Sequence, residues 1–216
     1  MLIAYWAAKG GSGTTVVAAA HALRVAVTSP TLLVDLDGDL PGALGTPTPE
    51  AGAAEWLAAG AGVPADALDR LALPIGPNLQ FIGRGDGPLD EARAPVLADL
   101  LVRSPHTVVV DCGSRPAGAA RAVAKRAARS VLVTRACYLA VQRCASVDLA
   151  PTEVALVREP QRALSADDIA ECVGAPIRMR VPIDPAVARA VDSGLLASRM
   201  PRALIRAVGP RLRAAS

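Results

Sequence analysis

The stretch of sequence that decides the fold of this chain is Lys9-Gly10-Gly11-Ser12-Gly13-Thr14-Thr15. Residues 2–6, which precede it, have the composition of a buried strand, and apolar residues recur at helical spacing over residues 14–27. Glycines let a turn present several backbone N–H groups on one side, and a helix N-terminus adds partial positive charge. The stretch therefore predicts a phosphate-binding loop between a strand and a helix. A plain glycine-rich turn is the alternative.

Strand-like and helix-like segments alternate along the rest of the chain. We expect strands at residues 2–6, 32–36, 79–82, 107–110, 131–134, 153–157 and 177–181. We expect helices at residues 14–27, 49–59, 66–73, 89–103, 117–128 and 139–147, and three more that start at Ser165, at Pro185 and near Arg199. This alternation predicts an α/β fold of three layers, with a doubly wound, mostly parallel sheet and helices on both faces. We assign residues 1–216 to a single domain.

Three of these helices carry residues that are typical of helix ends. Thr48 is expected to cap the second helix. Ser165 and Asp168 form a capping-box pattern, and Gly174 is expected to end the same helix. Asp184 is expected to cap the helix that follows the last strand.

The composition limits the classes of protein to which the chain can belong. Hydrophobic residues make up 52% but aromatic residues only 2%, so the core is expected to consist mostly of Ala, Val and Leu. A net charge of +3 is too small to indicate nucleic-acid binding by itself. Four cysteines without a CxxC pair, together with two histidines, argue against a structural zinc site and against a disulfide framework. No apolar run reaches the roughly 18 residues of a membrane span and no basic leader opens the chain, so we expect a cytoplasmic protein.

Two further segments place acidic residues directly after predicted strands. Asp35 and Asp37 end the segment Leu32-Leu33-Val34-Asp35-Leu36-Asp37, and Asp111 follows the apolar run of Thr107-Val108-Val109-Val110-Asp111-Cys112-Gly113. In a doubly wound sheet, the carboxyl ends of the strands face the ligand crevice. We therefore expect these carboxylates near the phosphate-binding loop. Acids that simply end a strand in solvent are the alternative.

These segments resemble the motifs of the ParA/MinD family of dimerising ATPases, which are P-loop NTPases of the SIMIBI type. The loop at residues 9–15 resembles the family's deviant Walker A pattern, KGGxGK[ST]. Residues 32–37 resemble its D-x-D strand, and residues 107–113 resemble its Walker B strand. The segment Val181-Pro182-Ile183-Asp184 resembles the hhP-x-D turn that follows the family's last strand.

The resemblance implies ATP and Mg²⁺ as cofactors and gives each site residue a role. The nucleotide-binding residues would be Lys9, Gly10, Gly11, Ser12, Gly13, Thr14, Thr15, Pro182 and Asp184. The residues around the metal would be Thr15, Asp35 and Asp111. Of the two catalytic residues, Asp37 would orient or activate the attacking water, and Lys9 would reach the nucleotide of the partner subunit in a homodimer. Gly113 would sense the γ-phosphate.

Two positions depart from the family's pattern. Thr14 stands where the family has a lysine that bonds the β- and γ-phosphates. Loss of one charge-assisted hydrogen bond costs about 1.5–3 kcal/mol, or about 10- to 100-fold in affinity, whereas loss of a donor aimed at the transition state costs about 10²- to 10³-fold in rate. We therefore expect nucleotide binding to persist and ATP hydrolysis to be weak or absent. Residues 157–159 stand where the family often has an asparagine that reads adenine, which leaves adenine specificity open.

The residue at position 14 also narrows the resemblance to one branch. A loop of this form without the lysine resembles the CpaE/TadZ group, which is associated with assembly of the Tad (Flp) pilus, and septum-site relatives are similar. The resemblance implies a spatial regulator at a cell pole or septum that recruits a pilus or division protein. A scaffold that dimerises without nucleotide and a DNA-partitioning ATPase are the alternatives.

Arginines crowd the C-terminus, at Arg199, Arg202, Arg206, Arg211 and Arg213. Three interpretations of these arginines are open. They are the solvated face of a helix, they bind DNA phosphates without sequence specificity, or they bind a membrane surface. The membrane is the least favoured of the three, because few apolar residues and no aromatic residue accompany the arginines.

Overall fold

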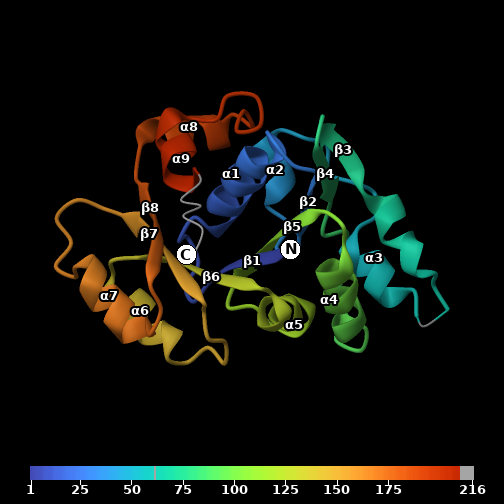
Figure 1. Cartoon of the computed structure of the whole chain (residues 1–216), viewed down its shortest axis with the longest axis horizontal. Helices are drawn as coiled ribbons and strands as arrows, with labels where there is room; N and C mark the ends of the chain where they lie inside the picture. The colour runs from blue at the N-terminus through green and yellow to red at the C-terminus, as the bar shows by residue number, and fades with distance from the viewer. Residues whose placement is uncertain (61, 210–216) are drawn as a thin grey trace, which may run out of the picture.

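The computed structural model has one eight-stranded sheet at its centre, with helices on both faces (Figure 1). The structure describes residues 1–60 and 62–209. In spatial order the strands are β3-β4-β2-β5-β1-β6-β7-β8. Their bounds are β1 Leu2–Ala7, β2 Thr31–Asp35, β3 Leu73–Gly76, β4 Leu79–Ile82, β5 Thr107–Ser114, β6 Arg129–Arg135, β7 Glu153–Arg158 and β8 Ile177–Pro182. All neighbours are parallel except β3 and β4, which confirms the predicted α/β class.

Helices cover the two faces of the sheet as two separate groups. Their bounds are α1 Thr14–Ala26, α2 Leu40–Leu44, α3 Ala53–Ala58, α4 Ala94–Arg103, α5 Gly118–Arg126, α6 Tyr138–Cys144, α7 Ala166–Val173, α8 Pro185–Asp192 and α9 Arg202–Val208. Two short 3₁₀ turns, η1 and η2, cover Ala65–Ala67 and Asp69–Leu71. The apolar side chains of α1, α2, α8 and α9 form one cluster with the sheet, and those of α3 to α7 form a second cluster on the other face. Within the described ranges, none of the helices combines the length and apolarity that crossing a bilayer requires.

Small side chains build most of the core, as the composition predicts. In α1, the side chains of Ala18, Ala19, Ala20 and Ala22 are fully buried. They let the helix lie close to β1 and β5, which it crosses (Figure 1). Since β1 is hydrogen-bonded on both sides, to β5 and to β6, the turn from β1 into α1 is fixed at the middle of the sheet.

Several helix boundaries differ from those predicted, and long-range contacts explain the best-defined case. The helix predicted at residues 49–59 covers only Ala53–Ala58, and Thr48 is not its cap. The first two N–H groups of the helix, those of Ala53 and Ala54, donate instead to carbonyls of the segment after β4, at 2.9 and 2.8 Å. The sequence around Thr48 contains no sign of this partner segment.

The segment before β4 is also different from the prediction. Residues predicted as a helix at 66–73 form the two 3₁₀ turns and the first residue of β3, an edge strand that was not predicted. The helix predicted at 89–103 starts at Ala94, and the last helix starts at Arg202, directly after a proline. Helix α2 was not predicted either. Arg211 and Arg213 lie outside the described residues.

Other helix ends agree with the prediction. The Ser165 hydroxyl accepts a hydrogen bond from the Asp168 N–H at 3.1 Å, and the Asp168 carboxylate accepts one from the Ser165 N–H at 2.8 Å. Gly174 ends the helix in the left-handed region, with φ of 71°. The Asp184 carboxylate accepts a hydrogen bond from the Ala186 N–H at 2.8 Å. Local sequence therefore determines these ends.

A buried polar pair joins β1 to α1. The Tyr5 hydroxyl lies 2.7 Å from His21 Nδ1. Burial and, to a smaller extent, the positive charge of Arg129 lower the pKa of His21 to about 4. Burial raises the pKa of Tyr5, so both side chains are uncharged at neutral pH.

His21 should make the fold sensitive to acid. Its pKa is about 4 in the folded protein and 6.5 in an unfolded chain, so between these values the unfolded state binds the additional proton. The contribution of His21 to the free energy of unfolding should therefore fall by up to ~3 kcal/mol as the pH drops from 6.5 to 4. Chemical denaturation of the wild type and of His21→Gln at a series of pH values would measure this contribution as the difference between the two profiles, because buried Asp111, with a pKa of about 7, titrates in the same range with the opposite sign. The control is His21→Gln, which keeps a polar partner for Tyr5 but does not titrate; an equal pH slope in both proteins would exclude His21 as the cause.

Candidate functional site

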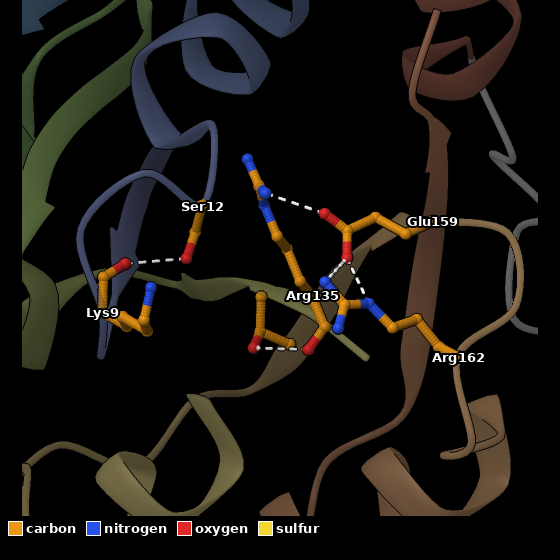
Figure 2. Close-up of polar contacts among 6 residues, drawn as sticks. Lys9, Ser12, Arg135, Glu159 and Arg162 are labelled. Atoms are coloured by element: carbon orange, nitrogen blue, oxygen red, sulfur yellow. Dashed lines mark hydrogen bonds and ion pairs between the residues drawn. The ribbon is translucent and has the colours of Figure 1, made fainter. Parts of the chain in front are cut away.

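The loop between β1 and α1 leaves the first N–H groups of the helix without a side-chain cap. Helix α1 begins at Thr14 after the N-cap residue Gly13, and its first turn contains no acidic residue. Gly11 and Gly13 are in the left-handed region, with φ of 72° and 89°. The Ser12 hydroxyl donates to the Lys9 carbonyl at 2.7 Å and closes the turn (Figure 2). Uncapped amides at the positive end of a helix dipole suit an anion.

Asp111 is a buried carboxylate with an unpaired oxygen. It lies near the carboxyl end of β5, next to β1, and is 0% exposed. Its Oδ1 accepts a hydrogen bond from the Gly113 N–H at 3.0 Å, and its Oδ2 has no hydrogen-bond partner among the described residues. Burial raises the pKa of Asp111 to about 7, although the Thr15 hydroxyl and the Gly113 N–H lower it.

Asp35 is equally buried but its oxygens are paired. Its Oδ1 accepts hydrogen bonds from the N–H groups of Asp37 and Gly38 at 2.9 and 2.7 Å, and its Oδ2 accepts one from Leu40 at 3.1 Å. Asp35 lies opposite Asp111 in the pairing of β2 with β5. It therefore shapes the turn after β2, and its predicted support of a metal shell stays a prediction.

Asp37 and Gly113 meet where β2 and β5 end. Gly113 has φ of 65°, and a Cβ added there would lie 2.0 Å from Asp37 Oδ1. Burial and the charge of Asp39 raise the pKa of Asp37, and Arg84 lowers it. The Asp37 side chain is nevertheless exposed, so it is accessible from solvent at this edge of the sheet.

Pro182 and Asp184 also lie at the carboxyl ends of the strands, but on β8 and just after it, three strands away from β1. The Ile183 N–H donates to the Arg158 carbonyl at 3.2 Å, which joins the ends of β7 and β8. The carboxylate of Asp184 caps α8. The structure thus brings residues 9–15, Asp35, Asp37 and Asp111 together on neighbouring strands, and it places Pro182 and Asp184 at the far side of the same edge.

A cluster that sequence reasoning missed lies at the carboxyl ends of β6 and β7, the two strands between β1 and β8. Arg135 at the end of β6 donates from Nη1 to Glu159 Oε1 at 2.7 Å, and Arg162 contacts the other oxygen of Glu159 (Figure 2). Nearby is a cavity of about 400 Å³, whose lining includes Leu156, Arg158, Glu159, Arg162, Leu164 and Arg180. In the sequence, residues 157–159 are distinctive only for the asparagine that they lack. Nothing in the local sequence pairs residue 135 with residue 159.

The residues around the loop fit a magnesium-bound nucleotide. No three His, Cys, Asp or Glu side chains in the described part of the chain cluster as ligands for a metal ion. Magnesium commonly needs only one or two protein groups, because phosphate oxygens and water complete its shell. The unpaired Oδ2 of Asp111, with the Thr15 hydroxyl beside that carboxylate, provides such groups.

Substitution of Gly113 should distort this edge of the sheet. In Gly113→Ala, the new methyl group would collide with the Asp37 carboxylate, in addition to the cost of about 1–2 kcal/mol for a left-handed residue with a side chain. Gly174→Ala is the matched control, since Gly174 has φ of 71° and no atom within 4 Å of the added Cβ. Chemical denaturation should show a larger loss of stability for Gly113→Ala; equal losses would mean that the contact with Asp37 is unimportant.

Several solved structures share this architecture. A ParA family ATPase from Chlorobium tepidum TLS has a TM-score of 0.79 and 21% identity, over 95% of this chain and 94% of that chain. The septum site-determining protein MinD from Pyrococcus horikoshii OT3, complexed with Mg-ADP, has a TM-score of 0.77 and 17% identity, over 95% and 91% of the two chains. The MinC:MinD cell division complex from Aquifex aeolicus contains a chain with a TM-score of 0.72 and 18% identity, over 89% and 85%.

Sequence comparisons add no closer relative. No protein-family model matches the chain, and no curated protein matches it at a significant level. The structural likeness covers nearly the whole of each chain at identities of 17–21%. The chain therefore has the fold of the ParA- and MinD-type P-loop ATPases.

Proposed function

We propose that this chain binds ATP and Mg²⁺ at residues 9–15 and acts as a spatial regulator of the ParA/MinD kind, with the nucleotide as its switch. The uncapped N-terminus of α1, preceded by two left-handed glycines, is the observation that carries the proposal. The similar MinD from Pyrococcus horikoshii, which was solved with Mg-ADP, supports it.

The described residues suit the phosphate end of a nucleotide. The N–H groups of residues 10–15 would bind phosphate oxygens. Thr15 and Asp111 would hold Mg²⁺, directly or through water, and the metal would neutralise phosphate charge. Asp35 would support this shell through the turn that it shapes, and Asp37, exposed beside Gly113, would orient the attacking water.

The base end of the nucleotide would lie toward β8. Two strands, β6 and β7, separate β1 from β8, so the distance across them is roughly 14 Å, which an extended nucleotide spans. Pro182 and Asp184 would lie near the base. The cavity at the ends of β7 and β8 is lined by both apolar and charged side chains, which would offer a heteroaromatic ring apolar contacts and hydrogen-bond partners.

Hydrolysis of the bound ATP should be weak or absent. Thr14 is 7% exposed and uncharged, so the loop itself has no cation at the position where the family has its lysine. Backbone N–H groups, Mg²⁺ and Lys9 remain to bind the ground state. A switch of this kind would act through nucleotide occupancy more than through turnover.

A face-to-face homodimer fits the exposed apolar residues at the edge of the sheet. Tyr138 and Leu139, just after β6, are 69% and 52% exposed, and Ile183, just after β8, is 50% exposed. They lie on the same edge as the loop, where Lys9 is half-buried. In the dimer, these side chains would be covered and each Lys9 would reach the nucleotide of the partner subunit.

The cellular role that we propose is assembly of a pilus or control of division at a cell pole or septum, in the cytoplasm, as a member of the CpaE/TadZ branch. The likeness to the chain in the MinC:MinD complex supports a division protein as partner.

Two other functions have specific support. Thr14 favours a scaffold that works without nucleotide, and Arg178, Arg180 and Arg206, which line one small cavity, favour nonspecific contact with DNA.

Calorimetric titration with ATP and Mg²⁺ would test the nucleotide site. The wild type should bind, and Thr15→Val should weaken binding about 10- to 100-fold, because a hydroxyl bonded to a charged partner is lost. Thr28→Val, an exposed threonine just beyond the other end of α1, should change nothing. Absence of binding by the folded wild type would leave only the scaffold.

Sedimentation velocity with ATP and Mg²⁺ would test the dimer. The double variant Tyr138→Ser/Leu139→Ser should raise the dimer dissociation constant more than about tenfold, because each apolar side chain buried at an interface contributes about 1.5–3 kcal/mol. Val96→Ser is the control, since Val96 is 47% exposed on α4, away from the loop. Equal dimerisation of all three proteins would place the interface elsewhere.

A further inference from the structure

The proposed phosphate site lacks its usual lysine, but an arginine ends the neighbouring strand. Strand β6 pairs with β1 up to the pair Trp6 and Leu132. Arg135 is the last residue of β6, and Lys9 follows the end of β1 by two residues, so both lie at the carboxyl ends of these two neighbouring strands. In Figure 2 the Arg135 side chain extends from the end of β6 into the space between Ser12 and Glu159.

The electrostatics of the turn after β6 agree with this arrangement. Cys137 follows Arg135 by two residues and is the N-cap residue of α6. The Ala140 N–H lowers the pKa of the Cys137 thiol most, and the charges of Arg162 and Lys9 lower it further. The charges of Lys9 from the loop and of Arg162 from the segment after β7 are therefore both within electrostatic range of the turn after β6.

The hydrogen bonds of Arg135 leave donors unused. Nη1 donates to Glu159, whereas Nε is buried and has no partner among the described residues. Glu159 also pairs with Arg162, so one carboxylate faces two guanidinium groups. Positive charge therefore remains in excess next to the loop.

The same two strands carry a second arginine–glutamate pair at their amino ends, and this pair serves as a comparison for Arg135 and Glu159. Arg129 Nε lies 2.6 Å from Glu153 Oε1, at the first residues of β6 and β7. The sequence separation, 24 residues, is the same as that of Arg135 and Glu159. One arginine faces one carboxylate in that pair, and Arg129 has no buried donor without a partner among the described residues.

We infer that Arg135 is the phosphate-binding cation of this protein and takes the place of the lysine that Thr14 replaces. Glu159 holds the guanidinium through Nη1, and the other donors are directed to the phosphate oxygens. A planar guanidinium suits such bidentate contacts. This inference rests on the proposed nucleotide binding at residues 9–15, and it adds a residue that no Walker A pattern contains.

Calorimetric titration of ATP and of ADP, both with Mg²⁺, would test it in four variants. Arg135→Met should weaken binding about 10- to 100-fold, and Arg135→Lys should recover part of the loss. Thr14→Lys in the Arg135→Met background should also recover affinity, because it returns a cation to the loop. Arg129→Met, the matched variant at the other edge, should bind within about twofold of the wild type, and thermal unfolding would confirm that each variant is folded.

The possible results separate this inference from the function on which it rests. If the wild type binds ATP and Arg135→Met binds it within twofold, the inference is wrong and the proposed function stands. Equal losses in Arg135→Met and Arg129→Met would also overturn it, since net charge or stability would then be the cause. If the folded wild type binds neither nucleotide, both the function and the inference are wrong.

Discussion

An uncapped helix end at the centre of a parallel sheet is the constraint on which the rest of the structure depends. Four fully buried alanines fix α1 against the sheet, and hydrogen bonds on both sides fix β1. The turn between them is therefore held with its N–H groups directed outward at the carboxyl edge. Left-handed Gly11 and Gly13 make that turn possible, and no side chain of the turn caps the helix.

The two buried acids beside this turn differ in how many of their carboxylate oxygens are hydrogen-bonded. Asp35 and Asp111 lie opposite each other in β2 and β5. Burial raises the pKa of both carboxyls. Three backbone N–H groups donate to Asp35 and partly offset this rise, whereas Asp111 keeps one unpaired oxygen and has a pKa of about 7. A buried carboxylate without full pairing is costly, and a divalent cation at this point would offset that cost. In the proposed function, the amides at these strand ends would bind phosphate and the Asp111 carboxylate would bind the metal.

The sequence predicts those parts of the fold that local patterns determine. The parallel strands, the loop at residues 9–15 and the caps at Ser165, Gly174 and Asp184 all follow from short-range rules. The start of α3 could not be predicted, because its first N–H groups bond to residues after β4. Edge strand β3 was missed for a similar reason, since it exists only through its pairing with β4.

The candidate site shows the same division between local and long-range information. Glycines, Thr15 and the acids at strand ends are recognisable as motifs. The contact of Arg135 with Glu159 joins the end of β6 to the residue after β7, 24 residues apart in sequence, and neither residue belongs to a motif. A departure from a motif, such as Thr14, indicates that another residue could supply the missing cation, but it does not identify that residue.

Hydrogen–deuterium exchange with and without ATP and Mg²⁺ tests the central claim most directly, because it reports on the backbone N–H groups themselves. The account predicts that the amides of residues 10–15 exchange more slowly when the nucleotide is present at saturating concentration, with little change at the amino edge of the sheet. Unchanged exchange of these amides under the same conditions would contradict it.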